Sequence, residues 1–294
     1  MDHVWDCIIV GAGAAGLSAA LVLGRARRRT LVVDAGRQSN RPSPGIGGLL
    51  GADGAAPEAF YAAGRAEIAK YGSVTVRDGE VVEGRREDDG FVLTLAGGAV
   101  ERARRVLLAT GMDYAHPDVP GVAERWGDGA FHCPFCHGFE HRDGVLGVLD
   151  RGASGVHRAL LLRIWSKDIT LLTDGPHELD DDERDRLDAA GIAVDERPVA
   201  ALRDGAVAFA DGAERACDGV LVPVTLRQRS ALATQLGART SGDVTPLHQD
   251  AIVVDEASGL FAAGDAAGMM PSVANAVAAG SNAAAAVVQS LAFA

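Results

Sequence analysis

Cysteine is scarce in this sequence, with only four residues in a chain of 294. Small secreted domains that rely on disulfides use cysteine far more densely, so a disulfide scaffold is excluded as the basis of this fold. Two of the four cysteines stand close together, as Cys133 and Cys136. We therefore expect a cytoplasmic protein in which this pair is a redox couple.

Basic residues are fewer than acidic residues in this sequence. The chain has 28 lysines and arginines against 40 aspartates and glutamates, which gives a formal net charge of −12. A surface of this sign repels phosphate backbones and anionic lipids, so we expect neither nucleic acid nor a membrane as a partner. The basic run at residues 25–29 is best explained as the end of a helix.

The sequence also lacks a convincing signal peptide or membrane span. Its first apolar run begins at once, beside acidic residues, and is typical of a strand. Residues 273–294 are apolar enough to suggest a transmembrane helix, but their alanine, glycine, serine and asparagine content favours a buried one. The length and a hydrophobic content of 48% indicate two soluble domains with sizeable cores.

What is present begins with a strand–turn–helix–strand pattern at the N-terminus. An apolar strand over residues 7–10 runs into Gly11-Ala-Gly-Ala-Ala-Gly16. A helix is predicted over residues 17–27 and a second strand over residues 30–33. That strand ends at Asp34, 23 positions after the first glycine. Strand, turn, helix and terminal acid in this order are characteristic of a dinucleotide-binding unit.

Each glycine of this turn has its own physical role. Gly11 permits the tight turn, Gly13 lets the backbone approach a pyrophosphate, and Gly16 allows close packing of the helix. Asp34 is placed to bind ribose hydroxyls. The sequence therefore predicts a bound dinucleotide at the N-terminal end of the helix.

A small β-meander is predicted next. Residues 74–76, 91–95 and 105–109 alternate in polarity, and the last of these segments returns as a parallel strand. The proline- and glycine-rich residues 117–121 then suggest a domain boundary.

A second strand–turn–helix pattern follows this boundary. Strands are predicted over residues 145–149 and 169–172, with a glycine-containing turn at 150–155 and a helix over 156–165. Residues 179–190 read as an acidic surface helix. We expect an α/β protein with two Rossmann-like domains of the three-layer ββα kind.

The C-terminal part returns to the first domain. A strand over residues 259–265 and a final helix with Ser272 as its N-cap complete the pattern. The second domain is therefore inserted into a discontinuous first domain.

A Cys-x-x-Cys pair carries the most specific chemistry. Cys133 and Cys136 can close a reversible disulfide, and His132 or His137 can stabilise a thiolate or accept its proton. Half of a zinc site is the alternative, but no further cysteine pair stands at ligand spacing, so we predict no metal.

The remaining cysteines and histidines carry no motif. Cys7 and Cys217 are expected to be buried thiols. Four histidines are expected at the surface: His141, His157, His177 and His248.

Taken together, these motifs resemble the thioredoxin-reductase-like flavoproteins. The resemblance rests on Gly11-Ala-Gly-Ala-Ala-Gly16, Ala109-Thr110-Gly111, Cys133-x-x-Cys136 and Phe261-Ala-Ala-Gly-Asp265, in this order. It covers nearly the whole chain. It implies an FAD-binding domain made of residues 1–115 and 243–294, an inserted NAD(P)-like domain of residues 116–242 that carries the cysteines, and a homodimer.

The resemblance also assigns the flavin site. The pyrophosphate of FAD would lie on the glycine turn, its ribityl and phosphate side by Gly264 and Asp265, and its ring before the start of the last helix. The implied FAD contacts are Gly11, Gly13, Ala14, Ala15, Gly16, Asp34, Ala109, Thr110, Gly111, Gly264, Asp265, Ser272 and Val273.

Two departures narrow the family. Ordinary thioredoxin reductases carry aspartate after the second cysteine, whereas this chain has His137. It is similar in this respect to the dithiol oxidases that close disulfides in gliotoxin-, holomycin- and romidepsin-type natural products. Those relatives also carry a histidine before the first cysteine, matched here by His132.

The second departure concerns the nicotinamide site. The turn of the inserted domain begins with Asp150 where a glycine belongs, and a carboxylate there repels a pyrophosphate. The strand that follows lacks the His-Arg-Arg cluster that grips a 2′-phosphate in NADPH-using relatives. We therefore do not expect NADPH, while NADH stays open because Asp174 follows Asp150 by 24 positions.

The resulting hypothesis is an FAD-dependent dithiol oxidase. A small dithiol attacks Cys133, leaves as a cyclic disulfide, and its electrons pass through Cys136 and flavin to molecular oxygen, which gives hydrogen peroxide. His132 or His137 serves as the base. The alternatives are an NAD(P)H-dependent thioredoxin or disulfide reductase, and a flavin-binding redox sensor without turnover.

Overall fold

The computed structural model describes residues 4–241, 251–253, 258–268 and 270–293, and the chain divides into two compact units. Unit 1 comprises Met1–Arg41, Leu49–Tyr114 and Thr225–Ala294, and unit 2 comprises Pro42–Gly48 and Ala115–Val224. The sequence placed the return to the first domain at residue 243. It comes at Thr225 instead, because the segment that follows contributes Leu232 and Leu236 to the core of unit 1.

Unit 1 is built on a mostly parallel sheet in the order β3-β2-β1-β6-β5-β4, with β19 also paired to β6. The pairs among β3, β2, β1 and β6 are parallel, as is the β6–β19 pair, whereas β4, β5 and β6 form an antiparallel meander. Its strands are β1 (Val4–Val10), β2 (Thr30–Asp34), β3 (Val74–Asp78), β4 (Val81–Glu87), β5 (Gly90–Leu95), β6 (Val100–Leu108) and β19 (Leu260–Ala262).

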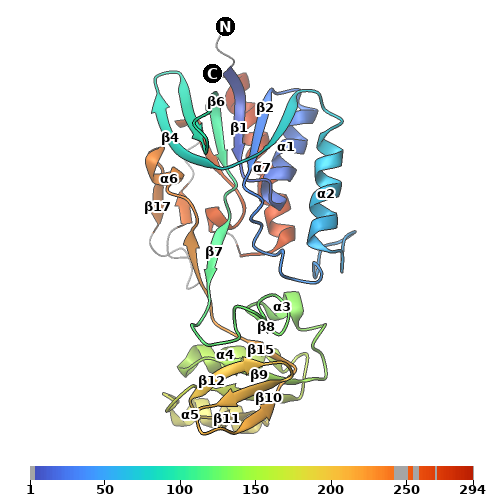
Figure 1. Cartoon of the computed structure of the whole chain (residues 1–294), viewed down its shortest axis with the longest axis vertical. Coiled ribbons are helices and arrows are strands. Elements are labelled where there is room, and N and C mark those ends of the chain that lie inside the picture. Colours follow the sequence, from blue (N-terminus) through green and yellow to red (C-terminus); the bar gives the residue numbers. More distant parts are fainter. Residues whose placement is uncertain (1–3, 242–250, 254–257, 269, 294) are drawn as a thin grey trace. The chain divides into compact units, whose positions relative to one another are not determined.

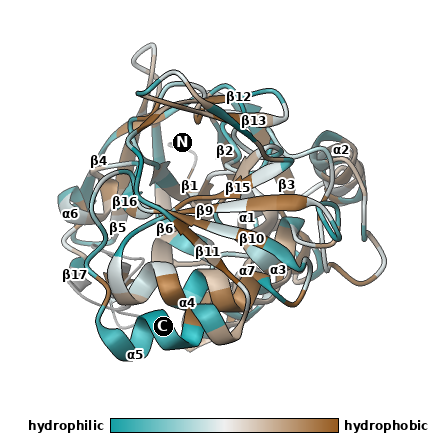
Figure 2. Ribbon diagram, turned by 90° about the horizontal axis from the view of Figure 1, so that it is seen from below, coloured by the Kyte–Doolittle hydropathy of each residue, from teal (hydrophilic) through white to brown (hydrophobic). Residues whose placement is uncertain are grey.

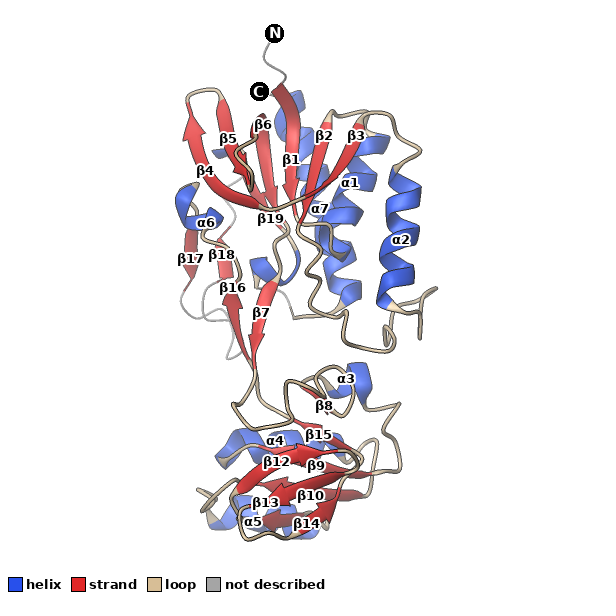
Figure 3. Ribbon diagram, in the orientation of Figure 1, coloured by secondary structure: helices blue, strands red, loops and turns tan. Residues whose placement is uncertain are grey.

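Helices cover one face of this sheet, as Figures 1 and 3 show. Alternate residues of a strand point to opposite faces, so Ile9 of β1 packs beneath these helices while Ile8 packs toward the meander. Two apolar cores result, which explains why β1 and β2 are apolar throughout. The helices of unit 1 are α1 (Ala14–Arg25), α2 (Pro57–Ile68), α6 (Leu232–Gln235), α7 (Val273–Ala292) and the 3₁₀ turn η2 (Gly264–Ala267).

Two local expectations in unit 1 were wrong. Residues 74–76 do not belong to the meander, because β3 pairs in parallel with β2 and extends the other side of the sheet. The first helix begins at Ala14 instead of residue 17, directly after its N-cap Gly13. Ala14 and Ala15 can begin a helix, but the glycines around them made a turn the simpler prediction from sequence.

Unit 2 repeats the parallel arrangement with a five-stranded sheet in the order β11-β10-β9-β15-β8. A three-stranded antiparallel sheet, β12-β13-β14, accompanies it. The strands are β8 (Ala130–Phe131), β9 (Val145–Leu149), β10 (Asp168–Leu172), β11 (Ala193–Asp195), β12 (Val199–Arg203), β13 (Ala206–Phe209), β14 (Glu214–Ala216) and β15 (Gly219–Leu221).

Three helices belong to unit 2: α3 (Pro134–His137), α4 (Gly152–Leu162) and α5 (Asp181–Ala189). Helix α4 begins four residues earlier than predicted, right at the turn after β9. Helix α5 is held by a capping box between Asp180 and Glu183, and it is hydrophilic along its length in Figure 2. The expected α/β class with two dinucleotide-type domains is confirmed.

The described residues include two further pairs of short strands, of which only the first lies where the chain passes between the units. Strand β7 (Met112–Ala115) pairs with β16 (Thr225–Gln228), and β17 (Arg239–Ser241) pairs with β18 (Ala251–Val253). Among the described residues, none of the helices combines the length and the apolar character that crossing a bilayer requires.

Candidate redox and dinucleotide sites

The turn between β1 and α1 is built so that only glycine fits at two positions. Gly11 has φ +104°, and a Cβ there would lie 2.3 Å from the carbonyl oxygen of Ala109. A Cβ on Gly16 would lie 1.8 Å from the carbonyl oxygen of Gly11. The turn is therefore folded tightly against the end of β6, and this brings Ala109 of the Ala109-Thr110-Gly111 motif beside it.

Gly13 differs from its neighbours because space lies above it. The heavy atom nearest to a Cβ built there is Cγ of Gln38, at 3.9 Å. No side chain in the described part of the chain caps α1, and its first turn carries no acidic residue. Free N–H groups at a helix N-terminus favour a phosphate, so the turn with Ala14 and Ala15 fits the pyrophosphate of a dinucleotide.

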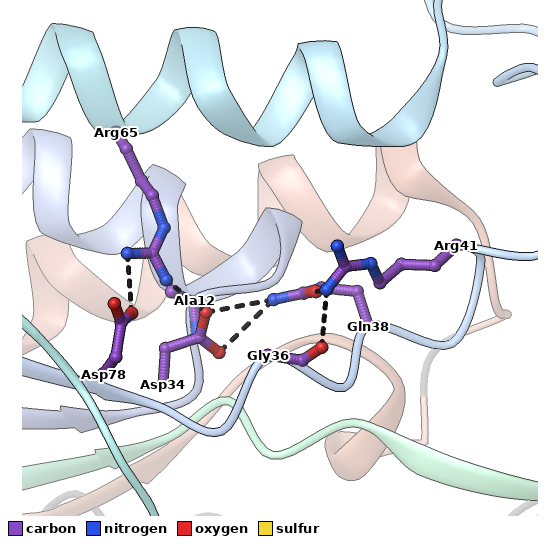
Figure 4. A network of polar contacts seen from close by, with 7 residues as sticks. All are labelled: Ala12, Asp34, Gly36, Gln38, Arg41, Arg65 and Asp78. Carbon is purple, nitrogen blue, oxygen red and sulfur yellow. Dashed lines mark hydrogen bonds and ion pairs between the residues drawn. The ribbon is translucent and has the colours of Figure 1, made fainter.

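Asp34 anchors this turn, as Figure 4 shows. Its carboxylate is 5% exposed and accepts hydrogen bonds from the N–H of Ala12 at 3.2 Å and from Nε2 of Gln38 at 3.1 Å. Arg65 of α2 forms an ion pair with it and with Asp78. Gln38 and Arg65 were not foreseen, because nothing in the sequence places them beside Asp34. Ribose binding by Asp34 stays a prediction.

The C-terminal motif lies beside the same turn. A Cβ on Gly264 would lie 3.0 Å from Cβ of Ala15, so η2 packs directly on the start of α1. Asp265 accepts a hydrogen bond from the hydroxyl of Tyr114 at 2.9 Å. Burial and the Asp265 carboxylate raise the pKa of Tyr114, which keeps this hydroxyl protonated as a donor. Tyr114 was missed by the sequence reasoning.

The last helix begins as expected. Ser272 caps α7 by accepting a hydrogen bond from the N–H of Asn275 at 3.1 Å, and Val273 is the first helical residue. The predicted N-cap is confirmed. Gly264, Asp265, Ser272 and Val273 thus all belong to unit 1 together with the glycine turn.

The cysteine pair belongs to unit 2. Cys133 and Cys136 form a disulfide, with their Cα atoms 5.3 Å apart. Cys133 is the N-cap of α3, and Pro134 occupies the first helical position, where its lack of an N–H costs nothing. The helix turn is what brings two cysteines of this spacing together.

The other two cysteines are unreactive by comparison. Cys7 and Cys217 are buried, and burial raises the pKa of both thiols, that of Cys217 to about 11. This matches their expected role as buried thiols. In the described residues, no three potential ligands of the histidine, cysteine, aspartate or glutamate type gather as a metal site.

His132 packs against an aromatic ring. Its ring stacks on Trp126 with centroids 5.6 Å apart, and Trp126 in turn contacts the ring of His116 at 5.4 Å. Burial, with smaller effects from His137 and Arg158, lowers the pKa of His132 to about 4. A ring so reluctant to accept a proton is a weak base for a thiol.

His137 has a different environment. Its Nε2 lies 3.0 Å from the carbonyl oxygen of Gly127 and 3.3 Å from Oγ of Ser43, and its ring stacks on Phe131 at 5.5 Å. Its Nδ1 has no hydrogen-bond partner among the described residues. Burial lowers the pKa of His137, against the opposing effect of the Gly127 carbonyl and Glu140. A neutral ring with one unused lone pair suits a general base.

The burial of His132 should make the free energy of unfolding depend on pH in the acid range. The unfolded chain protonates this ring near 6.5 and the folded chain only at about 4. Between these values the unfolded state binds more protons, so stability falls on acidification, by about 3 kcal/mol in all, and is unaffected at higher pH. His132→Gln should remove this part of the pH dependence in urea unfolding measured from about pH 7.5 to about pH 4.5.

The matched control is His157→Gln, because His157 is exposed. It should leave the pH dependence of unfolding as in the unmodified protein. Equal pH dependences of unfolding for His132→Gln and the unmodified protein would contradict the prediction.

Of the other histidines expected at the surface, His141 and His177 are in fact mostly enclosed, each 12% exposed, and His248 lies outside the described residues.

At the turn of the second dinucleotide-type fold, charged side chains pair with neighbouring groups of the same unit. The Asp150 carboxylate accepts a hydrogen bond from Oγ of Ser154 at 2.9 Å and pairs with Arg158. Arg151 reaches across to the end of β10, where its Nε donates to the carbonyl oxygen of Thr173 at 2.6 Å, and it also pairs with Asp174. Both acids noted in the sequence are thus engaged by arginines.

Comparisons with known proteins agree with this architecture. The model of the family described as pyridine nucleotide-disulphide oxidoreductase matches residues 5–280. Thioredoxin reductase tcpT of Claviceps purpurea (strain 20.1) is 33% identical and is aligned over 94% of this chain and 91% of its own length. Thioredoxin reductase sirT of Leptosphaeria maculans is 32% identical, over 90% and 87%.

Solved structures give the same result. The oxidoreductase from Agrobacterium tumefaciens superposes with a TM-score of 0.93 at 37% identity, covering 99% of both chains. HlmI superposes with a TM-score of 0.90 at 39% identity, covering 100% of this chain and 95% of its own.

Proposed function

The chain belongs to the pyridine nucleotide-disulphide oxidoreductases, and within this family we propose that it is an FAD-dependent dithiol oxidase acting on a small dithiol metabolite. Membership makes it a thiol–disulfide oxidoreductase and implies an FAD-binding flavoprotein. The observation that supports this direction of the reaction is the set of ion pairs at the dinucleotide-type turn of unit 2. We infer that these contacts disfavour a nicotinamide nucleotide, so that the electrons come from the thiol substrate.

Arg151 contacts both ends of the site that a nicotinamide dinucleotide would use. A dinucleotide in such a fold places its pyrophosphate at the turn after the first strand and its ribose at the end of the second strand. Arg151 spans these two places through Thr173 and Asp174. Asp150 adds a negative charge at the turn, and its ion pair with Arg158 holds it there. A pyrophosphate at this turn would compete with these contacts.

The disulfide supplies the chemistry of oxidation. One substrate thiolate attacks Sγ of Cys133, which forms a mixed disulfide and releases Cys136 as a thiolate. The second substrate thiolate attacks the substrate sulfur of this mixed disulfide, so a cyclic disulfide leaves and the enzyme keeps both electrons as a dithiol. When bound, FAD offers these two electrons a path to oxygen, with hydrogen peroxide as the product.

His137 is the residue we assign as the base. It directly follows Cys136, its Nδ1 lone pair is unused, and a proton taken up there leaves an imidazolium held by the Gly127 carbonyl. His132 has the lower pKa and is packed against Trp126, so we assign it a packing role. The sequence left the choice between the two histidines open.

Anaerobic titration of the purified yellow protein tests the proposal. Dithiothreitol as the dithiol should bleach the flavin absorbance, and admission of oxygen should restore it with release of hydrogen peroxide. NADPH and NADH should leave the spectrum unchanged. Free FAD under the same conditions is the control for direct reduction.

Two other outcomes of this titration would contradict the proposal. Rapid bleaching by NADPH or NADH would identify a nicotinamide-dependent disulfide reductase. Slow reduction by dithiothreitol without repeated turnover in oxygen would point to a redox sensor.

A further inference from the structure

A short segment that follows β2 in sequence packs on the redox helix. Residues 42–48, here called the strap, group with unit 2, although the residues on both sides of them group with unit 1. A Cβ on Gly47 would lie 2.7 Å from the carbonyl oxygen of Cys136, and a Cβ on Gly127 would lie 2.7 Å from the carbonyl carbon of Pro42. Ile46 is 3% exposed. The strap backbone is therefore in direct contact with α3 and with the loop that precedes β8.

Ser43 brings the strap to His137. Its hydroxyl donates to the carbonyl oxygen of Gly45 at 2.7 Å, which uses its one proton. Toward Nε2 of His137, at 3.3 Å, it can then offer only a lone pair. The Gly127 carbonyl, 3.0 Å from the same nitrogen, is also an acceptor only. Two acceptors at one ring nitrogen require that nitrogen to carry the hydrogen.

The other ring nitrogen is consequently the basic one. In a neutral imidazole with its hydrogen on Nε2, Nδ1 carries the lone pair. Nδ1 of His137 is buried and makes no hydrogen bond among the residues that the structure describes, although the Cys133 carbonyl lies close enough to the ring to favour its charged form. Stacking on Phe131, with planes 20° apart, fixes the plane of the ring, and turning the ring over within this plane would remove Nε2 from Gly127 and Ser43.

We propose that Ser43 is a positioning residue, through which the strap fixes His137 as an Nδ1 base for the Cys133–Cys136 pair. The base role rests on the proposed function, whereas the fixed tautomer does not. When Nδ1 takes a proton from a substrate thiol, the ring becomes a cation and its Nε2–H bonds to Ser43 and Gly127 strengthen. Ser43 thus favours the protonated product of this step.

Other groups around the ring act alongside Ser43. Glu140 favours the charged ring, whereas His141 and burial disfavour it, and His132 lies close enough to respond to its charge. The Cys133 carbonyl favours the cation as well. Because none of these groups changes in a Ser43 variant, an altered acid response can be assigned to the lost hydroxyl.

Reduction of the disulfide by dithiothreitol is the first test. The anaerobic reaction is quenched with an alkylating agent and the freed cysteines are counted by mass, so no flavin signal is needed. Ser43→Ala should slow the reaction about three- to tenfold near neutral pH. The acid limb, which is the fall of the rate at low pH, should move to lower pH by about half a unit to one unit. The reason is that the His137 cation loses one hydrogen-bond acceptor.

Three further variants complete the test. Ser43→Thr keeps the hydroxyl and should restore the rate and the acid limb. Ser73→Ala, in the turn before β3, should match the unmodified protein. His137→Gln should abolish the limb. Unchanged rate and limb in Ser43→Ala would overturn the proposal, as would a slower rate with an unmoved limb, which indicates a structural role only.

The tautomer itself is measured by nitrogen NMR of ring-labelled histidine, with the His137 signals identified by their loss in His137→Gln. The oxidised protein should show His137 protonated on Nε2. Protonation on Nδ1 would overturn the strap proposal. A different result would be a ring protonated on Nε2 together with a rate of dithiothreitol reduction that is the same in His137→Gln as in the unmodified protein. It would refute the base role in the proposed function, but it would leave the contact between the strap and His137 intact.

Discussion

Replacing Cys133 with serine is expected to abolish dithiol oxidation while the protein stays yellow. A hydroxyl cannot form the mixed disulfide, so turnover should fall by at least about a thousandfold. Closure of so short a loop, with a sequence separation of 3, contributes little to folding, so the fold should be retained. Oxygen consumption with dithiothreitol measures turnover, and flavin absorbance per protein measures retention of the cofactor.

Two matched cysteine variants locate the effect. Cys217→Ser changes a buried thiol that donates to the carbonyl oxygen of Gly219 at 3.3 Å, and it should keep full turnover. Cys136→Ser leaves Cys133 without its resolving partner and should also lose turnover. Full oxidation by Cys133→Ser would refute the assigned chemistry, and loss in Cys217→Ser would show that removing any thiol is damaging.

Gly13→Asp should yield a folded but colourless protein. The space above Gly13 admits a side chain, since the nearest heavy atom to a new Cβ is 3.9 Å away. A carboxylate there would face the diphosphate of FAD, and repulsion of about 3 kcal/mol corresponds to roughly a hundredfold loss of affinity. The same carboxylate interacts favourably with the N-terminus of α1, so the flavin-free protein should not be destabilised.

Two other glycine variants serve as controls for Gly13→Asp. Gly13→Ala should bind FAD far better than Gly13→Asp, because it adds no charge. Gly16→Ala should misfold, because its Cβ would lie 1.8 Å from the Gly11 carbonyl oxygen. Flavin content after purification and thermal unfolding of the flavin-free protein separate these outcomes. A yellow Gly13→Asp protein would show that the dinucleotide does not lie over this turn.

Local sequence patterns were reliable where neighbours along the chain decide the structure. The strand at residues 7–10, the glycine turn and the Ser272 cap follow from hydrophobic runs, backbone sterics and a short-range hydrogen bond. Pairing between distant segments was harder to predict. The strand at residues 74–78 could join either β2 or the meander, and its own sequence does not distinguish the two.

The candidate redox site shows the same division. The spacing of Cys133 and Cys136 predicts a disulfide couple, because one helical turn brings such residues together. The two flanking histidines looked equivalent in sequence. In the structure, one ring stacks on Trp126, while Nε2 of the other lies within hydrogen-bond distance of Gly127 and Ser43.

The sequence by itself determined the α/β class, the dinucleotide turn, the redox couple and the unusual acid at Asp150. These features depend on residue type and spacing over a few turns of chain. Only the tertiary structure decided that Arg151 and Arg158 pair with Asp174 and Asp150, that the strap packs on α3, and that Nδ1 of His137 makes no hydrogen bond among the described residues. Such contacts join residues many positions apart, and side-chain packing, which sequence spacing does not encode, selects them.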